Sequence, residues 1–119
     1  MSGKSNIICK RIYSIATNSD GYRLLIDRVW PRGISKEKAK LDEWNKDIAP
    51  SDALRKWFDH DADRFDEFAK RYKNELKAKK EDLNRIQEMA KHKTVCLLYG
   101  AKNEVHNQAV VLKEVLESL

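Results

Sequence analysis

Residues 95–99 read Val-Cys-Leu-Leu-Tyr, an uninterrupted apolar run with a lysine-rich segment before it and Gly100 after it. Such a run indicates a β-strand that is covered on both faces, at the centre of a sheet. Beyond Gly100, apolar residues recur at helical spacing from Glu104 to Leu119, which predicts an amphipathic helix. The chain is therefore expected to end in a buried strand and a helix that covers it.

Two further strands are expected near the start of the chain. Residues 7–12 form a short apolar segment interrupted by two basic residues, as expected of a strand near a sheet edge. Turn-forming residues follow at 17–21, and residues 22–29 then read as a second strand before Pro31 stops regular pairing. The residues between the two strands are too few for a standard helical crossover, so the direction of their pairing stays open.

The middle of the chain carries helical patterns with local start signals. Ser35 can cap a short helical turn that runs to Leu41, and Ser51 can cap a second. Asp61 is the next candidate cap, before apolar residues that share one helical face. Another helix follows, either after a break near residues 79–81 or as a continuation of the first. The apolar positions of these two helices are Phe65, Phe68, Tyr72 and Leu76, then Leu83, Ile86 and Ala90.

Together these patterns predict a single α/β domain over residues 1–119, with residues 1–6 as a flexible N-terminus. We expect a small, mostly parallel sheet of three strands or slightly more, covered by helices. The length suits one domain with one modest core. The composition, 41% hydrophobic and 36% charged, fits a folded chain with a solvated surface.

Composition also bears on location and on cofactor chemistry. No apolar run approaches the roughly 20 residues that span a bilayer, and no secretory signal is visible, so we expect a cytoplasmic protein without membrane contact. Cys9 and Cys96 lie in apolar, strand-like surroundings, which favours buried thiols over a disulfide or a metal site. The sequence also lacks a phosphate loop, a GxGxxG motif and a Gly-x-Ser-x-Gly motif. We therefore predict no cofactor.

The net charge of +5 is unevenly distributed along the chain. Residues 1–40 contain nine Lys or Arg against three acids, whereas residues 41–119 contain fifteen against sixteen. This asymmetry points to an anionic partner, either a phosphate-bearing small molecule or nucleic acid. A surface whose charges serve only solubility explains the pattern equally well.

The segment from Asp27 to Gly33 directly follows the second expected strand. In open parallel α/β sheets, ligands bind beyond the carboxyl ends of the strands, so this position is informative. Arg28 and Arg32 offer guanidinium donors for phosphate or carboxylate, and Trp30 offers a flat apolar wall. Asp27 can orient an arginine or act as a base. The structural alternative is an arginine–carboxylate pair that holds a loop over a core tryptophan.

A second candidate segment, residues 99–107, joins the central strand to the last helix. Free backbone N–H groups at such a turn suit an anion. Tyr99 and Asn107 can position a ligand there, and the His106 imidazole can transfer protons if it faces a cleft. The structural alternative is a surface or capping role, which is commoner for a lone histidine near a helix start.

A third group of aromatic and charged residues spans residues 55–61. Its aromatic residues are expected in the core, while Arg55 can hold an anion. The Asp-His-Asp string at 59–61 invites a metal interpretation, but adjacent residues rarely point at one ion. We therefore predict no metal site and keep His60 as a weak ligand candidate.

These segments resemble stretches of the YeaO-like proteins, small bacterial proteins classified under domain of unknown function 488. The resemblance covers most of the chain and implies an α/β domain without an established activity. The matching stretches are, in order, Lys10-Arg11-Ile12-Tyr13, Asp20-Gly21-Tyr22-Arg23, residues 27–33, Ala49-Pro50-Ser51, Leu54-Arg55-Lys56-Trp57-Phe58, and Leu97-Leu98-Tyr99 with His106-Asn107.

The chain departs from longer members of that group at two places. Those members carry a cysteine after the third strand and a Cys-His-Arg string in the following helix. Here Tyr99 stands near the first position and Val105-His106-Asn107 near the second, so only His106 remains. The resemblance therefore implies no thiol chemistry for this chain.

The leading functional hypothesis is a site for a small anionic ligand, phosphate- or carboxylate-bearing, at the C-terminal ends of the strands. Whether the site is catalytic stays open, because no nucleophile is identifiable. The residues assigned to it are Arg28, Arg32 and Arg55 as charge clamps, Trp30 or Trp57 as a wall, His106 and Asp27 as acid–base groups, and Tyr99 and Asn107 as positioning groups.

Two alternative functions remain open. The first is a nucleic-acid-binding or regulatory module, in which the basic N-terminal third contacts phosphates and the tryptophans stack on unpaired bases. The second is a protein-interaction domain without catalysis, which predicts an exposed apolar patch. The sequence gives no oligomeric state.

Overall fold

The computed structural model describes residues 6–119 and contains a four-stranded sheet. All neighbouring strands run parallel. The predicted α/β class with a small parallel sheet is therefore confirmed, while residues 1–5 of the expected flexible N-terminus lie outside the described residues. The strands are β1 (Ile7–Arg11), β2 (Tyr22–Leu25), β3 (Glu43–Trp44) and β4 (Val95–Tyr99), in the spatial order β1-β4-β2-β3.

β4 lies inside the sheet, as its apolar composition predicts. It pairs with β1 on one side and β2 on the other, which leaves β1 at an edge, also as predicted. All residues of β4 are buried, because both faces of the sheet are covered. Side chains alternate between faces along a strand. Leu97 and Tyr99 accordingly join one core cluster, while Cys96 and Leu98 join the other.

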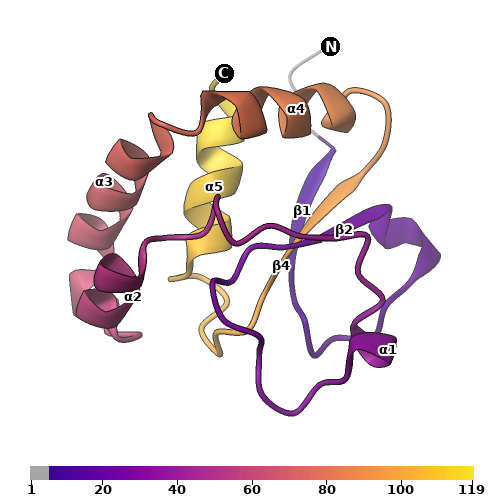
Figure 1. Cartoon of the computed structure of the whole chain (residues 1–119), viewed down its shortest axis with the longest axis horizontal. Coiled ribbons are helices and arrows are strands. Elements are labelled where there is room, and N and C mark those ends of the chain that lie inside the picture. Colours follow the sequence, from indigo (N-terminus) through magenta and orange to yellow (C-terminus); the bar gives the residue numbers. More distant parts are fainter. Residues whose placement is uncertain (1–5) are drawn as a thin grey trace.

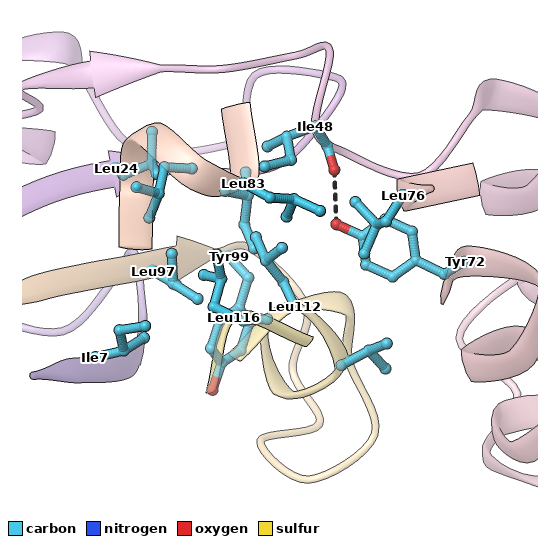
Figure 2. Packing of buried hydrophobic residues seen from close by; sticks show 14 of the residues in the cluster. Ile7, Leu24, Ile48, Tyr72, Leu76, Leu83, Leu97, Tyr99, Leu112 and Leu116 are labelled. Atoms are coloured by element: carbon cyan, nitrogen blue, oxygen red, sulfur yellow. Dashed lines mark hydrogen bonds between the residues drawn. The ribbon is translucent and has the colours of Figure 1, made fainter. Parts of the chain in front are cut away.

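Helices cover one face of the sheet, and the larger core cluster lies between them and the strands (Figure 1). Figure 2 shows Leu24 and Leu97 of the sheet beside Leu83 and Leu112 of the helices. Burying such a side chain fully stabilises the fold by about 1.5–3 kcal/mol. No helix within residues 6–119 combines the length and apolar character needed to cross a membrane. The covering helices are α2 (Asp52–Phe58), α3 (Phe65–Leu76), α4 (Lys80–Ala90) and α5 (Gln108–Glu117).

The opposite face is covered by the long connection between β2 and β3. This connection contains only one short helix, α1 (Lys36–Ala39), whose Ala39 is buried in the smaller core cluster. Trp30 and Trp44 pack against the same cluster, with their rings edge to face and their centroids 5.2 Å apart. The two indoles thus supply much of the apolar cover on this side.

One strand prediction needs correction, and one strand was not predicted. β2 ends at Leu25, earlier than the expected Val29, because beyond it the chain no longer pairs with β3. The indole N–H of Trp44 donates a hydrogen bond to the Asp27 carbonyl instead, at 2.7 Å. β3 itself was not predicted, since two residues are too few to show a strand pattern. β1 and β2 are parallel but not neighbours, because β4 lies between them.

The helix starts are mostly as predicted. Ser35 and Ser51 cap α1 and α2, and Asp61 caps the 3-10 turn η2 (Ala62–Arg64) that leads into α3. The helical structure is interrupted between α3 and α4 at residues 77–79, so these are two separate helices. The prediction for the last helix was too long, because α5 begins only after its cap, Asn107.

The two cysteines are free thiols in apolar surroundings, as predicted. Cys96 is buried in β4, and the half-buried Cys9 donates its S–H to the Ala109 carbonyl at 3.6 Å. Burial raises the pKa of both thiols to about 11. Little reactive thiolate is therefore present at neutral pH.

A buried ion cluster holds the turn between β1 and β2, which contains the 3-10 turn η1 (Asn18–Asp20). Asp20 is only 2% exposed and lies 2.9 Å from the Lys10 ammonium and 2.5 Å from the Arg23 guanidinium. Burial alone would raise the pKa of Asp20, but hydrogen bonds from Lys10 and Thr17 lower it to about 2. The charged form of Asp20 is therefore the one that stabilises the fold.

Replacing Asp20 with asparagine should destabilise the protein by about 3 kcal/mol at pH 7, because buried Arg23 loses its counter-charge. Since the folded pKa lies below the ordinary value, the contribution of Asp20 is complete above about pH 4 and is lost as the pH falls toward 2. Urea denaturation of both proteins from pH 7 downward should show their difference shrinking in this window. The exposed Asp66→Asn is the control, and a pH-independent difference for Asp20→Asn would contradict the assignment.

Candidate functional site

A pocket of about 360 Å³ lies beyond the carboxyl ends of β1, β2 and β4. Each strand contributes through the loop that follows it: Tyr13 after β1, residues 27–32 after β2, and Gly100 with Ala101 after β4. This is the place where open parallel α/β sheets bind their ligands. The helical side of the pocket is lined by Pro50, Arg55, Phe58, His60, Phe68 and Gln108.

Asp27 lies in the pocket wall and ties several elements together. Its carboxylate accepts one hydrogen bond from the Gly100 N–H, at 2.9 Å, and another from the side-chain amide of Gln108. Its backbone carbonyl accepts the bond from Trp44. The end of β2 is thereby joined to the end of β4, to the start of α5 and to β3.

Burial raises the pKa of the Asp27 carboxyl to about 6, because removal from water disfavours the charged form. The hydrogen bonds from Gly100 and Gln108 and the positive charge of Arg55 oppose this rise. The carboxyl therefore changes its protonation state close to neutral pH. Perturbed carboxyls in a pocket are typical of functional sites.

Gly100 allows the two strand ends to approach each other closely. A Cβ at this position would lie 2.9 Å from Asp27 Oδ2 and 3.2 Å from the Cβ of Pro31. A side chain there would therefore push the Asp27 carboxylate or the loop after β2 away. The absence of a side chain lets the backbone N–H reach the carboxylate.

Arg28 is half-buried and held by backbone oxygens. Its Nε donates to the Pro50 carbonyl at 2.8 Å, and its Nη2 donates to the Ala49 carbonyl at 3.4 Å. Arg28 therefore does not form the arginine–carboxylate pair that was the structural alternative for this segment. These bonds fix the side chain and leave Nη1 without a hydrogen bond to any residue from 6 to 119, which suits it to an anion.

Two more guanidinium groups reach the pocket from exposed positions. Arg32 forms no ion pair within the described part of the chain. Arg55, on α2, pairs with Asp52 at 2.6 Å, and both side chains are exposed. Surface pairs of this kind contribute only about 0–1 kcal/mol. Arg55 can therefore exchange this partner for a ligand at little cost.

His60 brings an imidazole to the same pocket through a strained backbone. α2 ends at Phe58, and the next two residues, Asp59 and His60, have φ values of 45° and 56°. Non-glycine residues in this left-handed region cost about 1–3 kcal/mol each, and such strain clusters at functional sites. The sequence marked His60 only as a weak ligand candidate, and the structure places it in the same pocket as the three arginines.

Aromatic side chains form the apolar part of the pocket. Trp30 is half-buried, and its indole N–H donates to a backbone carbonyl of its own loop at 2.9 Å. Phe58 and Phe68 stack with their centroids 4.2 Å apart. Tyr13 is partly exposed and donates its hydroxyl to the Arg32 carbonyl at 2.6 Å.

Four of the sequence candidates lie outside this pocket, and one of them is Trp57, which has the Arg71 guanidinium over its ring. Tyr99 is 2% exposed and packs within the larger core cluster (Figure 2). Asn107 is fully buried, because its side chain caps α5. His106 packs edge-on against the Phe65 ring, with centroids 4.9 Å apart, and contacts the Asn103 amide. The candidates that the structure does bring together are Asp27, Arg28, Trp30, Arg32 and Arg55.

A family model described as "Inactive DUF488-N3 subclade" matches residues 6–119. The chain belongs to this family. "Uncharacterized protein YeaO" of Escherichia coli is 46% identical over 114 residues, which cover 96% of this chain and 99% of that protein. "Uncharacterized protein Rv3073c" of Mycobacterium tuberculosis is 34% identical over 116 residues, or 98% of each chain. No solved structure matches.

Sequence reasoning on this DUF488-N3 chain singled out Arg55 and His60 but missed several other pocket residues that come from outside the loop after β2. Phe58 and Phe68 have the spacing of ordinary core residues, and Gln108 is the first residue of α5 without any motif around it. Tyr13 carried a usable signal, because it closely follows β1 and so lies at the same sheet edge as Asp27.

Replacing Gly100 with alanine should destabilise this DUF488-N3 protein by about 1–3 kcal/mol, because the new Cβ overlaps the Asp27 carboxylate. Urea denaturation followed by circular dichroism measures the loss. In an Asp27→Ala background the overlap is relieved, so the two changes should couple by about 0.5 kcal/mol or more. Strictly additive losses would contradict the contact.

Proposed function

We propose that the pocket binds a small anionic ligand that carries a phosphate or carboxylate group. The observation that carries this proposal is the convergence of Arg28, Arg32 and Arg55 on a pocket whose acidic lining is Asp27 alone within the described chain. Guanidinium groups match the geometry of both anions. Because burial raises the pKa of Asp27, part of its negative charge is removed near neutral pH.

Binding without turnover is the role that we assign to this pocket. Its lining includes no serine, threonine, cysteine or lysine from residues 6–119, side chains that commonly act as covalent nucleophiles. The word "Inactive" in the description of the matching family supports the same interpretation. His60 and Asp27 then serve to recognise the ligand rather than to transform it.

The small-ligand proposal is better supported than nucleic-acid binding through the N-terminal third. Single-stranded nucleic acid stacks successive bases on several aromatic faces, whereas Trp44 packs edge to face against Trp30 and Trp57 has an arginine over its ring at 4.3 Å. Of the basic residues in that third, Lys10 and Arg23 are already engaged by Asp20. These groups have little capacity left for a nucleic-acid strand.

Replacing Arg32 with glutamine should weaken the binding of inorganic phosphate about tenfold, since a hydrogen bond to a charged group contributes about 1.5–3 kcal/mol. The exposed Arg32 side chain forms no internal ion pair among the described residues, so the fold should survive the change. Isothermal titration calorimetry at fixed ionic strength measures the affinity.

The matched control is Arg71→Gln. Arg71 is also exposed and lies outside the pocket on α3, where it pairs with Glu67 at 2.9 Å. This variant should bind phosphate as the wild type does. Equal losses in both variants, or no phosphate binding by the wild type at millimolar concentrations, would contradict the proposal.

Sulfate affinity should fall as the pH rises through about 6, because Asp27 then loses its proton and its carboxylate repels the anion. His60 and the arginines also act on the anion, so the comparison with Asp27→Asn isolates the effect of Asp27. The affinity of this variant relative to wild type should rise severalfold between pH 5 and pH 7.5. A ratio that is independent of pH would place Asp27 outside the binding site.

A further inference from the structure

The pocket is larger than a bare inorganic anion requires. Its volume of about 360 Å³ lies within the range of about 300–1,000 Å³ that is usual for sites of organic small molecules. One phosphate or carboxylate group at the guanidiniums would leave much of this space to another part of the ligand. The rest of the lining indicates the chemistry of that part.

The aromatic residues of the lining offer only apolar contact. The indole N–H of Trp30 is already bonded to the Ile34 carbonyl, and the hydroxyl of Tyr13 is bonded to the Arg32 carbonyl. Phe58 has no polar atom. A ligand group that lies against these rings therefore finds carbon surfaces and no open hydrogen-bonding partner.

A polyol would be poorly matched to this lining. Its hydroxyl groups need several hydrogen-bond partners once water is removed, and each unpaired group costs about 1–3 kcal/mol. Asp27 and Gln108 already bond to each other, and the Tyr13 hydroxyl is bonded to the Arg32 carbonyl, which leaves His60 and the arginines as the main polar partners in the pocket. A flat apolar group loses no hydrogen bonds in the same space.

We propose, resting on the anion site described above, that the ligand is an organic anion with an aromatic body. Its phosphate or carboxylate group contacts Arg28, Arg32 and Arg55, and its ring packs against Trp30 and Phe58. Cationic groups and aromatic surfaces line the same pocket, so one molecule of this class can use both.

Phenyl phosphate and methyl phosphate are the probes, because both are phosphate monoesters of similar charge and only the first has a ring. Isothermal titration calorimetry on the full chain should give phenyl phosphate about tenfold tighter binding or more. Trp30→Leu should reduce this preference at least threefold. Trp57→Leu is the matched control, because Trp57 is half-buried like Trp30 but lies outside the pocket. The Trp57→Leu variant should keep the preference for phenyl phosphate.

Each outcome has a distinct meaning. Equal affinities for the two esters would overturn the aromatic body and leave the anion site standing, whereas binding of neither ester would overturn the proposed function and this inference together. If Trp30→Leu does not fold, nuclear Overhauser effects in the wild type replace it. Contacts from the phenyl protons to the rings of Trp30 and Phe58 support the inference, and contacts only elsewhere overturn it.

Discussion

The hydrogen bonds that the Asp27 carboxylate accepts from Gly100 and Gln108 hold the pocket end of the molecule together. They join the end of β2 to the end of β4 and to the start of α5, which lie 73 and 81 residues later in the sequence. Gly100 makes the approach possible because it has no side chain. The loop that carries Arg28, Trp30 and Arg32 begins at this junction, so its position over the sheet edge depends on these bonds.

Buried Asp20 and half-buried Asp27 have pKa values displaced in opposite directions, and their partners explain the difference. Asp20 contacts two cations directly, so it remains charged and stabilises the turn between β1 and β2. Asp27 receives only hydrogen bonds from neutral groups, and burial therefore raises its pKa. Asp20 forms a structural ion cluster, whereas Asp27 is a carboxyl of variable charge beside the three arginines of the proposed anion site.

Local signals made much of the fold predictable, and the lack of such signals explains the failures. The apolar run of β4 and the serine caps of α1 and α2 act through neighbouring residues, so the sequence displays them. Tyr99 and Asn107 show where prediction from sequence fails. Both belong to a strand-to-helix turn of the kind that binds ligands, yet the tyrosine is buried in the core and the asparagine side chain caps α5. The contributions of Phe58 and Gln108 to the pocket depend on tertiary packing of this DUF488-N3 chain, for which periodicity gives no clue.

The most direct test of this account is the titration of the Asp27 side-chain carboxyl carbon by nuclear magnetic resonance, with the Gly100 amide proton followed in the same samples. The account predicts that both signals titrate together with a midpoint near pH 6, because the carboxyl is largely withdrawn from water and bonded to that amide. A midpoint near the ordinary value of about 3.9, or an amide proton that does not follow the carboxyl, would contradict it.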